Sequence, residues 1–341
     1  MCVKRYFNLV ITLVFTIIWV GGVTRLTGSG LSITEWQLFT GILPPLSDSA
    51  WELAFQKYQT IPQYTLINEG MELSNFKIIY FWEWFHRLVG RSIGLVAFIG
   101  FALLSFRGLW PSKRIRHKTL IGALMIAAQG AIGWYMVKSG LNQGTSVSPY
   151  RLSIHLSTAF VILYYWTRLS LDLRPASTFS PLQASSRDLY KLRVLFYTSL
   201  SVFALQVIYG AWVAGMKAGY AFPTYPLMGG EWFPWSSVME GKGLLNLSIN
   251  PIVIQWVHRW LGVAVLLVCG YFFKKLYNFD HKEVRRIILL LTCSLVAQFA
   301  LGIATLVYGV PVLLGSLHQL NAGILVFLFA RLSFFLKTGN P

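Results

Sequence analysis

The chain has 341 residues, of which 55% are hydrophobic and only 12% are charged, and its formal net charge is +17. Soluble domains carry about 25% charged residues, so this composition excludes an ordinary soluble domain and predicts an all-α polytopic membrane protein. The positive charge could indicate nucleic acid, but basic cytoplasmic loops beside a lipid bilayer explain it better, so we expect no nucleic-acid partner.

Eight apolar runs are long enough to cross a bilayer, for which about 20 residues are needed. They cover residues 6–23, 78–106, 119–137, 150–171, 194–216, 251–273, 287–309 and 312–336. The first run resembles a signal peptide, but no convincing small-residue cleavage site follows it. We therefore predict eight transmembrane helices, with the first one retained.

Lysine and arginine lie mainly on one side of the predicted spans. Of the 29, 19 lie at the two termini or in and beside the loops after the second, fourth and sixth spans, and seven lie in the other loops. Basic loops stay in the cytoplasm, so both termini are predicted there. Nothing resembles a transit peptide, so a bacterial cell inner membrane is the predicted location. The long segment 24–77 then lies outside, and we expect it to fold over the outer face.

One motif occurs in both halves of the chain, with the form [Glu/Gln]-Trp-x-His-Arg-x-x-Gly. Its first copy begins at Glu83 and its second at Gln255. Further matching pairs are Ala128-Gln129 with Ala297-Gln298, and Ser153-Ile154-His155 with Ser316-Leu317-His318. We therefore predict two pseudo-repeated four-helix bundles, in parallel because each has an even number of spans. The N-terminal unit covers 1–171, a cytoplasmic linker 172–193, and the C-terminal unit 194–341.

Glu83 lies inside a predicted span, where a charged group costs roughly 2.5–3.5 kcal/mol on insertion scales. His86 follows it by three residues and so shares its helix face. The second copy of the motif has Gln255 in place of the carboxylate. This difference suggests one reactive site and one electron-transfer site.

Four of the six histidines lie on the even-numbered spans: His86, His155, His258 and His318. The other two, His117 and His281, lie in basic loops and are expected to be solvated. A lone histidine in a span often only binds a neighbouring helix, but four in repeated pairs favour a ligand. Two facing imidazoles in a four-helix bundle form a pair of axial haem ligands. Zinc or copper fits less well, because the second half has no carboxylate or thiolate at that level.

Haem propionates are anions that need basic partners near the outer surface. The candidates are Arg25, Arg87, Arg91, Arg151 and Arg259. Small residues such as Gly130, Gly133, Gly262 and Gly302 would let a flat macrocycle approach the helices, although plain helix packing explains each of them equally well.

These residues together resemble the haem A synthase family. The resemblance covers essentially the whole chain and rests on three features: the segment from Gly21 to Ser32, the segment Glu83-Trp84-Phe85-His86-Arg87, and the paired histidines on an eight-helix repeat. Some family members carry a cysteine pair in the first outer loop. Segment 24–77 has no cysteine, so the chain resembles the cysteine-free subgroup with a long first loop.

The resemblance implies an oxidoreductase that converts the C8 methyl of haem O to a formyl group by two successive hydroxylations, giving haem A for terminal oxidases. It implies a haem b held by His258 and His318, a substrate haem between His86 and His155, and a catalytic carboxylate at Glu83. It also suggests a haem O synthase as delivery partner, with a further electron-transfer partner that the sequence does not identify.

Two other functions compete with this one. A di-haem b electron carrier would use the same four histidines but gives no role to the difference between Glu83 and Gln255. A haem or solute transporter is less supported, because the sequence has no large cytoplasmic coupling domain.

Overall fold

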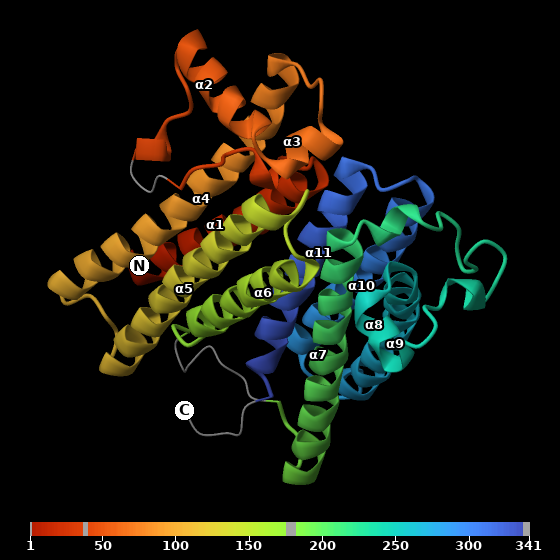
Figure 1. Cartoon of the computed structure of the whole chain (residues 1–341). Helices are drawn as coiled ribbons and strands as arrows, with labels where there is room; N and C mark the ends of the chain where they lie inside the picture. Colours follow the sequence, from red (N-terminus) through yellow and green to blue (C-terminus); the bar gives the residue numbers. More distant parts are fainter. Residues whose placement is uncertain (1, 37–39, 175–181, 337–341) are drawn as a thin grey trace.

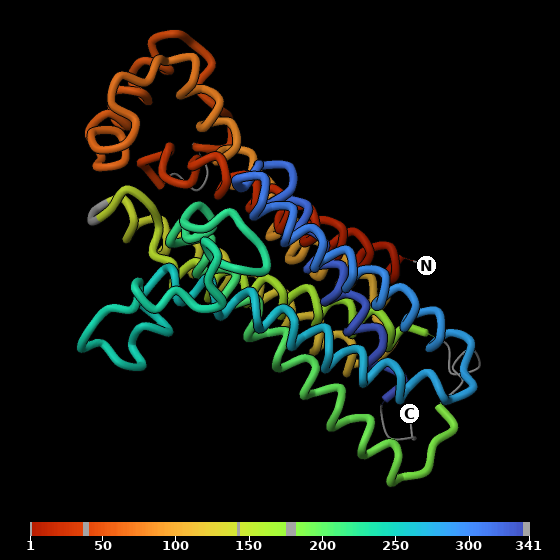
Figure 2. Tube along the Cα trace, turned by 90° about the vertical axis from the view of Figure 1, so that its right-hand side faces the viewer, coloured from red at the N-terminus to blue at the C-terminus, as the bar shows by residue number. Residues whose placement is uncertain are grey.

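The computed structural model describes residues 2–36, 40–174 and 182–336, and of residues 40, 142 and 143 only the backbone. Eight described helices have at least 22 residues. They are α1 (Cys2–Leu26), α4 (Leu73–Phe106), α5 (Lys113–Gln143), α6 (Pro149–Leu171), α7 (Ser186–Gly215), α9 (Pro251–Tyr277), α10 (Lys282–Val307) and α11 (Val312–Ser333). They lie side by side as one elongated bundle (Figures 1 and 2).

Seven of these helices are long and apolar enough to cross a membrane, and α6 is the one that is not among them. The all-helical membrane-protein class is therefore confirmed. Large apolar side chains on the outside of the bundle, such as Leu267 and Leu289, are well exposed, as expected for surfaces that face lipid acyl chains.

Several helices begin or end away from the predicted positions. α7 begins at Ser186, inside the segment predicted as a linker, and residues 175–181 of that segment lie outside the described part of the chain. The reason is capping: Ser112 and Ser185 accept hydrogen bonds from backbone N–H groups in the first turns of α5 and α7. A helix begins at its cap, whereas an apolar run marks only the part inside the bilayer.

The segment between α1 and α4, which is predicted to lie outside, contains folded structure. It contains α2 (Asp48–Gln59) and α3 (Pro62–Ile67), which stand beyond one end of the bundle in Figure 2. The phenol of Tyr58 is buried there between Gln63 and Asn68, and burial raises the pKa of this phenol. Gln63 donates to the Gly28 carbonyl oxygen (2.9 Å), which ties the two small helices to the end of α1.

A second short region lies between α7 and α9. It contains the 3-10 helices η4 (Ala218–Tyr220), η5 (Trp235–Ser237) and η6 (Gly243–Leu245), followed by α8 (Asn246–Ile249). It leaves the same end of the bundle as α2 and α3 (Figure 2).

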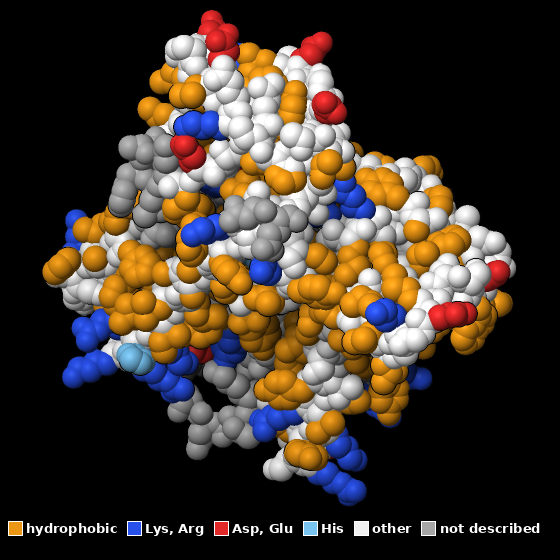
Figure 3. All heavy atoms as spheres, in the orientation of Figure 1, with side chains coloured by type: hydrophobic (Ala, Val, Ile, Leu, Met, Phe, Trp, Pro, Cys, Tyr) orange, Lys and Arg blue, Asp and Glu red, His pale blue; other side chains and the backbone are white. Residues whose placement is uncertain are grey.

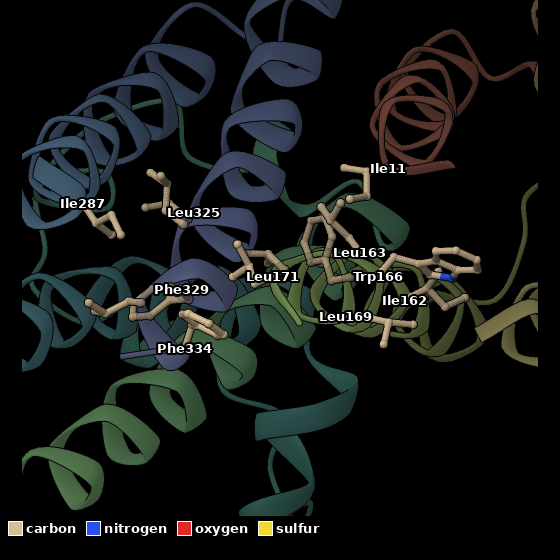
Figure 4. Close-up of a cluster of buried hydrophobic side chains, with 14 of the residues drawn as sticks. Ile11, Ile162, Leu163, Trp166, Leu169, Leu171, Ile287, Leu325, Phe329 and Phe334 are labelled. Carbon is tan, nitrogen blue, oxygen red and sulfur yellow. The ribbon is translucent and has the colours of Figure 1, made fainter. Parts of the chain in front are cut away.

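The helices pack within each half and across the middle of the bundle. In the first half α1 contacts α4 and α6, and α5 contacts α4 and α6; in the second half α9 contacts α7 and α10, and α10 contacts α11. The halves meet through α6 with α7 and α11, and α1 with α11. Figure 4 shows the common core, where Ile11 lies near Leu163 and Trp166 of α6, and Leu325 and Phe329 of α11 continue it.

Candidate active site

The four intramembrane histidines form two pairs. His86 of α4 lies close enough to His155 of α6 for an electrostatic interaction, and His258 of α9 has the same relation to His318 of α11. Each pair joins two helices of one half of the chain. The structure therefore brings together the residues that the sequence paired.

Each of these four histidines lies against a glycine of a neighbouring helix. A Cβ atom at Gly21 would stand 3.2 Å from Nε2 of His86, and one at Gly133 would stand 2.9 Å from Cε1 of His155. In the second half, a Cβ at Gly210 would approach Cε1 of His258 to 2.9 Å. A Cβ at Gly302 would approach Cε1 of His318 to 3.0 Å. A side chain at any of these positions would displace an imidazole, so the glycines keep room for the rings.

Three glutamines reach the rings, and sequence reasoning gave them no role. The amide nitrogen of Gln129 lies 3.1 Å from Nδ1 of His155, and that of Gln298 lies 3.2 Å from Nε2 of His318. The amide nitrogen of Gln206 lies 3.5 Å from Nε2 of His258. All three occur four residues before a histidine-facing glycine. The Gln-x-x-x-Gly spacing is only a weak sequence signal for these glutamines, because the chain has it at Gln37 and Gln319 as well.

Glu83 is buried, with 3% of its surface exposed, and three donors surround its carboxylate. Arg87 Nη2 lies 2.6 Å from Oε1, the Ser32 hydroxyl donates to Oε2 (2.8 Å), and the Ile33 N–H donates to Oε2 (2.7 Å). Arg87 also donates to the carbonyl oxygens of Ile33 and Glu35, both at 2.9 Å. The ion pair therefore fastens the chain just after α1 onto α4.

The second half uses the same construction without the carboxylate. Arg259 donates to the carbonyl oxygens of Phe222 and Thr224, both at 2.6 Å, in the segment after α7. Gln255 is 2% exposed, and neither of its amide atoms has a hydrogen-bond partner within the described chain. The two copies of the motif thus hold their outer segments with equivalent arginines but differ at the residue beside the histidine.

The tryptophans of the motif act in the same way. Trp84 donates from its indole N–H to the Ile42 carbonyl oxygen (2.9 Å), and Trp256 donates to that of Trp232 (2.8 Å). In each half the tryptophan of the motif therefore also binds the backbone of a segment between two long helices.

The other candidate arginines lie at different places. Arg25 donates to the Ala214 carbonyl oxygen and so links α1 to α7. The guanidinium of Arg151 lies 4.7 Å from the ring centroid of Tyr135. Arg91 is partly buried on α4, one turn beyond Arg87. Because Arg87 and Arg259 are engaged with several backbone carbonyls, Arg25 and Arg151 are better placed to offer donors to an anion.

The arrangement fits haem better than a bare metal ion. Among the described residues, no group of three or more His, Cys, Asp or Glu side chains could hold a metal ion. A haem iron needs only two axial ligands from the protein, and each half supplies two imidazoles. Buried polar atoms without partners lie beside the second pair, at Nδ1 of His258 and on Gln255. Such atoms are expected where a bound group completes a site.

Comparison with known proteins agrees with this chemistry. The profile of the cytochrome oxidase assembly protein family matches residues 4–330, a range that contains all the site residues above. A haem A synthase of Rhodospirillum centenum is 41% identical over 92% of this chain and 82% of its own. One from Rickettsia felis is 39% identical, covering 96% and 95%, and one from Rickettsia canadensis is 38% identical, covering 99% and 98%.

The chain belongs to the haem A synthase family. The resemblance drawn from the sequence motifs is therefore confirmed, with the match extending over nearly the whole chain.

Proposed function

We propose that this protein is an oxidoreductase that converts haem O to haem A, and that its two halves divide the work. The first half binds haem O between His86 and His155, and the second half holds a haem b between His258 and His318. The observation that carries the proposal is the presence of two histidine pairs, only one of which has a carboxylate beside it. Family membership supports the reaction itself.

The haem iron supplies the redox chemistry when haem is bound, and the chain supplies ligands, orientation and an acid–base group. Glu83 lies one turn before His86 on α4, so its carboxylate is within the first half's site. Glu83 is paired with Arg87, and a carboxylate is a group that can exchange a proton, which oxidation of a methyl group requires. Gln255 cannot exchange a proton in this way, so the second half is suited to electron transfer.

The same ion pair also orders the outer segment, which gives Glu83 a structural task beside the chemical one. Ser32 and Ile33, which bind Oε2, belong to the segment that Arg87 holds over the site. We infer that this segment and its counterpart at 222–227 cover the outer mouths of the two haem sites. Propionates would then meet Arg25 and Arg151 more readily than Arg87 and Arg259, and Arg91 stays a candidate from the sequence.

We further propose eight crossings, with both termini in the cytoplasm of a bacterium and the protein in its inner membrane. α1 begins and α11 ends at the end of the bundle away from α2 and α3 (Figure 2), which requires an even number of crossings. α6 has 23 residues, about 34 Å at 1.5 Å per residue, which is enough to span a bilayer. On the face in Figure 3, Lys and Arg side chains gather at that same end, and acidic side chains lie over α2 and α3.

Reporter proteins test the orientation. A reporter that works only in the cytoplasm should be active when it is fused to the C-terminus. A reporter that works only outside the cytoplasm should be active when it is inserted between α2 and α3. Two reporters on the same side would contradict the proposed topology.

The test of function is haem extraction. Cells that express this chain with a haem O synthase, the proposed delivery partner, should contain haem A or a hydroxylated intermediate when their haems are separated by chromatography. A di-haem b electron carrier would leave haem O unchanged in the same cells. The electron-transfer partner that reoxidises or reduces the protein stays to be identified, and the second half is where we expect it to act.

A further inference from the structure

The residue four positions before each histidine-facing glycine is a glutamine in three cases and an isoleucine in the fourth. Gln129 precedes Gly133, Gln206 precedes Gly210, and Gln298 precedes Gly302. Before Gly21, which faces His86, the residue is Ile17. The exception therefore concerns one ligand of the proposed substrate haem.

Ile17 and Gln206 occupy equivalent places in the two halves. Cδ1 of Ile17 lies 3.4 Å from where a Cβ of Gly90 would stand, and Nε2 of Gln206 lies 3.3 Å from the corresponding position at Gly262. Gly90 and Gly262 each come four residues after the histidine of their motif. A glutamine at position 17 would therefore reach His86 as Gln206 reaches His258.

The two kinds of side chain do different things to an imidazole. An amide carries both a donor and an acceptor, so it can hydrogen-bond the ring and fix its orientation. When a histidine binds a metal, its other ring N–H needs an acceptor, which the amide oxygen of a glutamine at this position can supply. An isoleucine offers only packing. Within the described chain, no hydrogen bond reaches the imidazole of His86, whereas the other three rings each have a glutamine amide within 3.5 Å.

The glutamine in the second half that faces His318 is itself anchored. Asn321 donates to Oε1 of Gln298 (2.8 Å), and the Ser294 hydroxyl donates to Oδ1 of Asn321 (2.9 Å). In the first half Thr158 stands at the position of Asn321, and its hydroxyl donates to carbonyl oxygens of its own helix. The polar network around the ligands is thus most complete in the second half and missing around His86.

We propose that His86 is the exchangeable ligand of the substrate haem, and that isoleucine at position 17 makes it so. Gln129, Gln206 and Gln298 are positioning residues that hold the other three imidazoles. Release of a bound iron by His86 would leave the electron pair on the ring nitrogen, so such an exchange would need no redox partner. The isoleucine at position 17 would then explain why the first half releases its haem whereas the second half keeps its own. This inference rests on the proposed function, because it assigns haem O to the first half.

The test exchanges the two equivalent residues, with carbon monoxide as the probe for an iron whose ligand can be displaced. The full chain, as wild type, Ile17→Gln and Gln206→Ile, is purified from cells that also make haem O synthase. Haem extraction gives the occupancy of each protein, and the dithionite-reduced proteins are titrated with carbon monoxide. Ile17→Leu serves as the matched apolar control.

In the wild type we expect carbon monoxide to bind the substrate haem and not haem b. Ile17→Gln should weaken carbon monoxide binding at the occupied first site by about 10-fold or more, the range typical of changes beside a metal ligand. Ile17→Leu should behave as the wild type, and Gln206→Ile should make haem b reactive. The last variant tests the idea from the opposite direction and does not depend on the folding of Ile17→Gln.

Equal carbon monoxide affinity in wild type and Ile17→Gln, at equal occupancy, would overturn this inference and leave the proposed function standing. An unreactive haem b in Gln206→Ile would also count against it. A wild-type protein that carries only haem b, even with haem O synthase present, would overturn the proposed function and this inference together.

Discussion

The two halves of the bundle carry the same motif, and within the motif they differ at the polar residue three positions before the histidine. In the first half, a carboxylate beside the histidine is bound by Arg87 and by two donors of the outer segment. In the second half, the amide of Gln255 is buried with neither atom paired, while Arg259 holds its outer segment through backbone carbonyls alone. Holding the outer segment therefore does not require a carboxylate, and Glu83 is present for a further reason.

The largest effect should come from removing a ligand of the second half. His258→Ala or His318→Ala should abolish the stable low-spin haem b, because no other described side chain of the ligand type stands beside either imidazole. Absorption spectra of the purified proteins measure this, with His117→Ala, at an exposed position near the start of α5, as control. An unchanged bis-histidine spectrum in either ligand variant would remove haem b from this site.

Glu83→Gln tests the difference between the halves directly, because it makes the first half resemble the second. Loss of a general acid–base group typically lowers a rate about 10²–10⁴-fold, so haem O or a partly oxidised haem should accumulate while haem b stays normal. The measurement is haem A per molecule of purified protein.

One further variant helps to separate the chemical role of Glu83 from its structural role. Ser32→Ala removes one donor to Glu83 but keeps the carboxylate, so it should retain most of the activity. If Glu83→Gln lowers haem b content or stability while the surviving protein still makes haem A, the carboxylate only neutralises Arg87.

The two arginines should differ in their contribution to stability. Arg87→Ala leaves a buried carboxylate without its cation, a change that costs about 3–5 kcal/mol in unfolding free energy. Arg259→Ala leaves only carbonyl oxygens without donors, for which about 1–3 kcal/mol is expected. Unfolding in mixed micelles by increasing dodecyl sulfate compares them.

The double variant Arg87→Ala, Glu83→Gln provides the internal check. It should recover part of the loss, because the buried group is then neutral. Equal destabilisation by the two single arginine variants, with no recovery in the double variant, would show that the ion pair adds nothing to the first half.

The smallest effects should come from the glycines that face the rings. Gly133→Ala should disturb only the substrate haem and Gly210→Ala only haem b, because each added methyl group would stand 2.9 Å from one imidazole. Overpacking of this kind costs about 1–3 kcal/mol. Extraction and absorption spectra report the two haems separately, and Gly94→Ala, where a Cβ would meet no atom within 4 Å, is the control. A loss at both sites from either variant would mean that the halves are not independent.

The sequence by itself determined the membrane class, the long helices and the identity of the four histidines. These follow from local properties: an apolar run long enough for a bilayer must be helical to satisfy its backbone, and an ionisable group inside it must have a reason to be there. The repeated motif also predicted which histidine corresponds to which. The helix ends were less accurate, because caps such as Ser185 lie in polar segments outside the bilayer.

Only the tertiary structure decided what surrounds each histidine. Glu83 is bound by residues about 50 positions earlier in the chain, and the glutamines reach the rings from neighbouring helices. Side chains such as Ile17 look like ordinary lipid-facing or packing residues in a sequence, since hydropathy records composition and not direction. Their role can be seen only in the tertiary structure, where helix packing places them beside an imidazole. At that place, an amide or a hydrocarbon side chain decides how firmly the histidine is held.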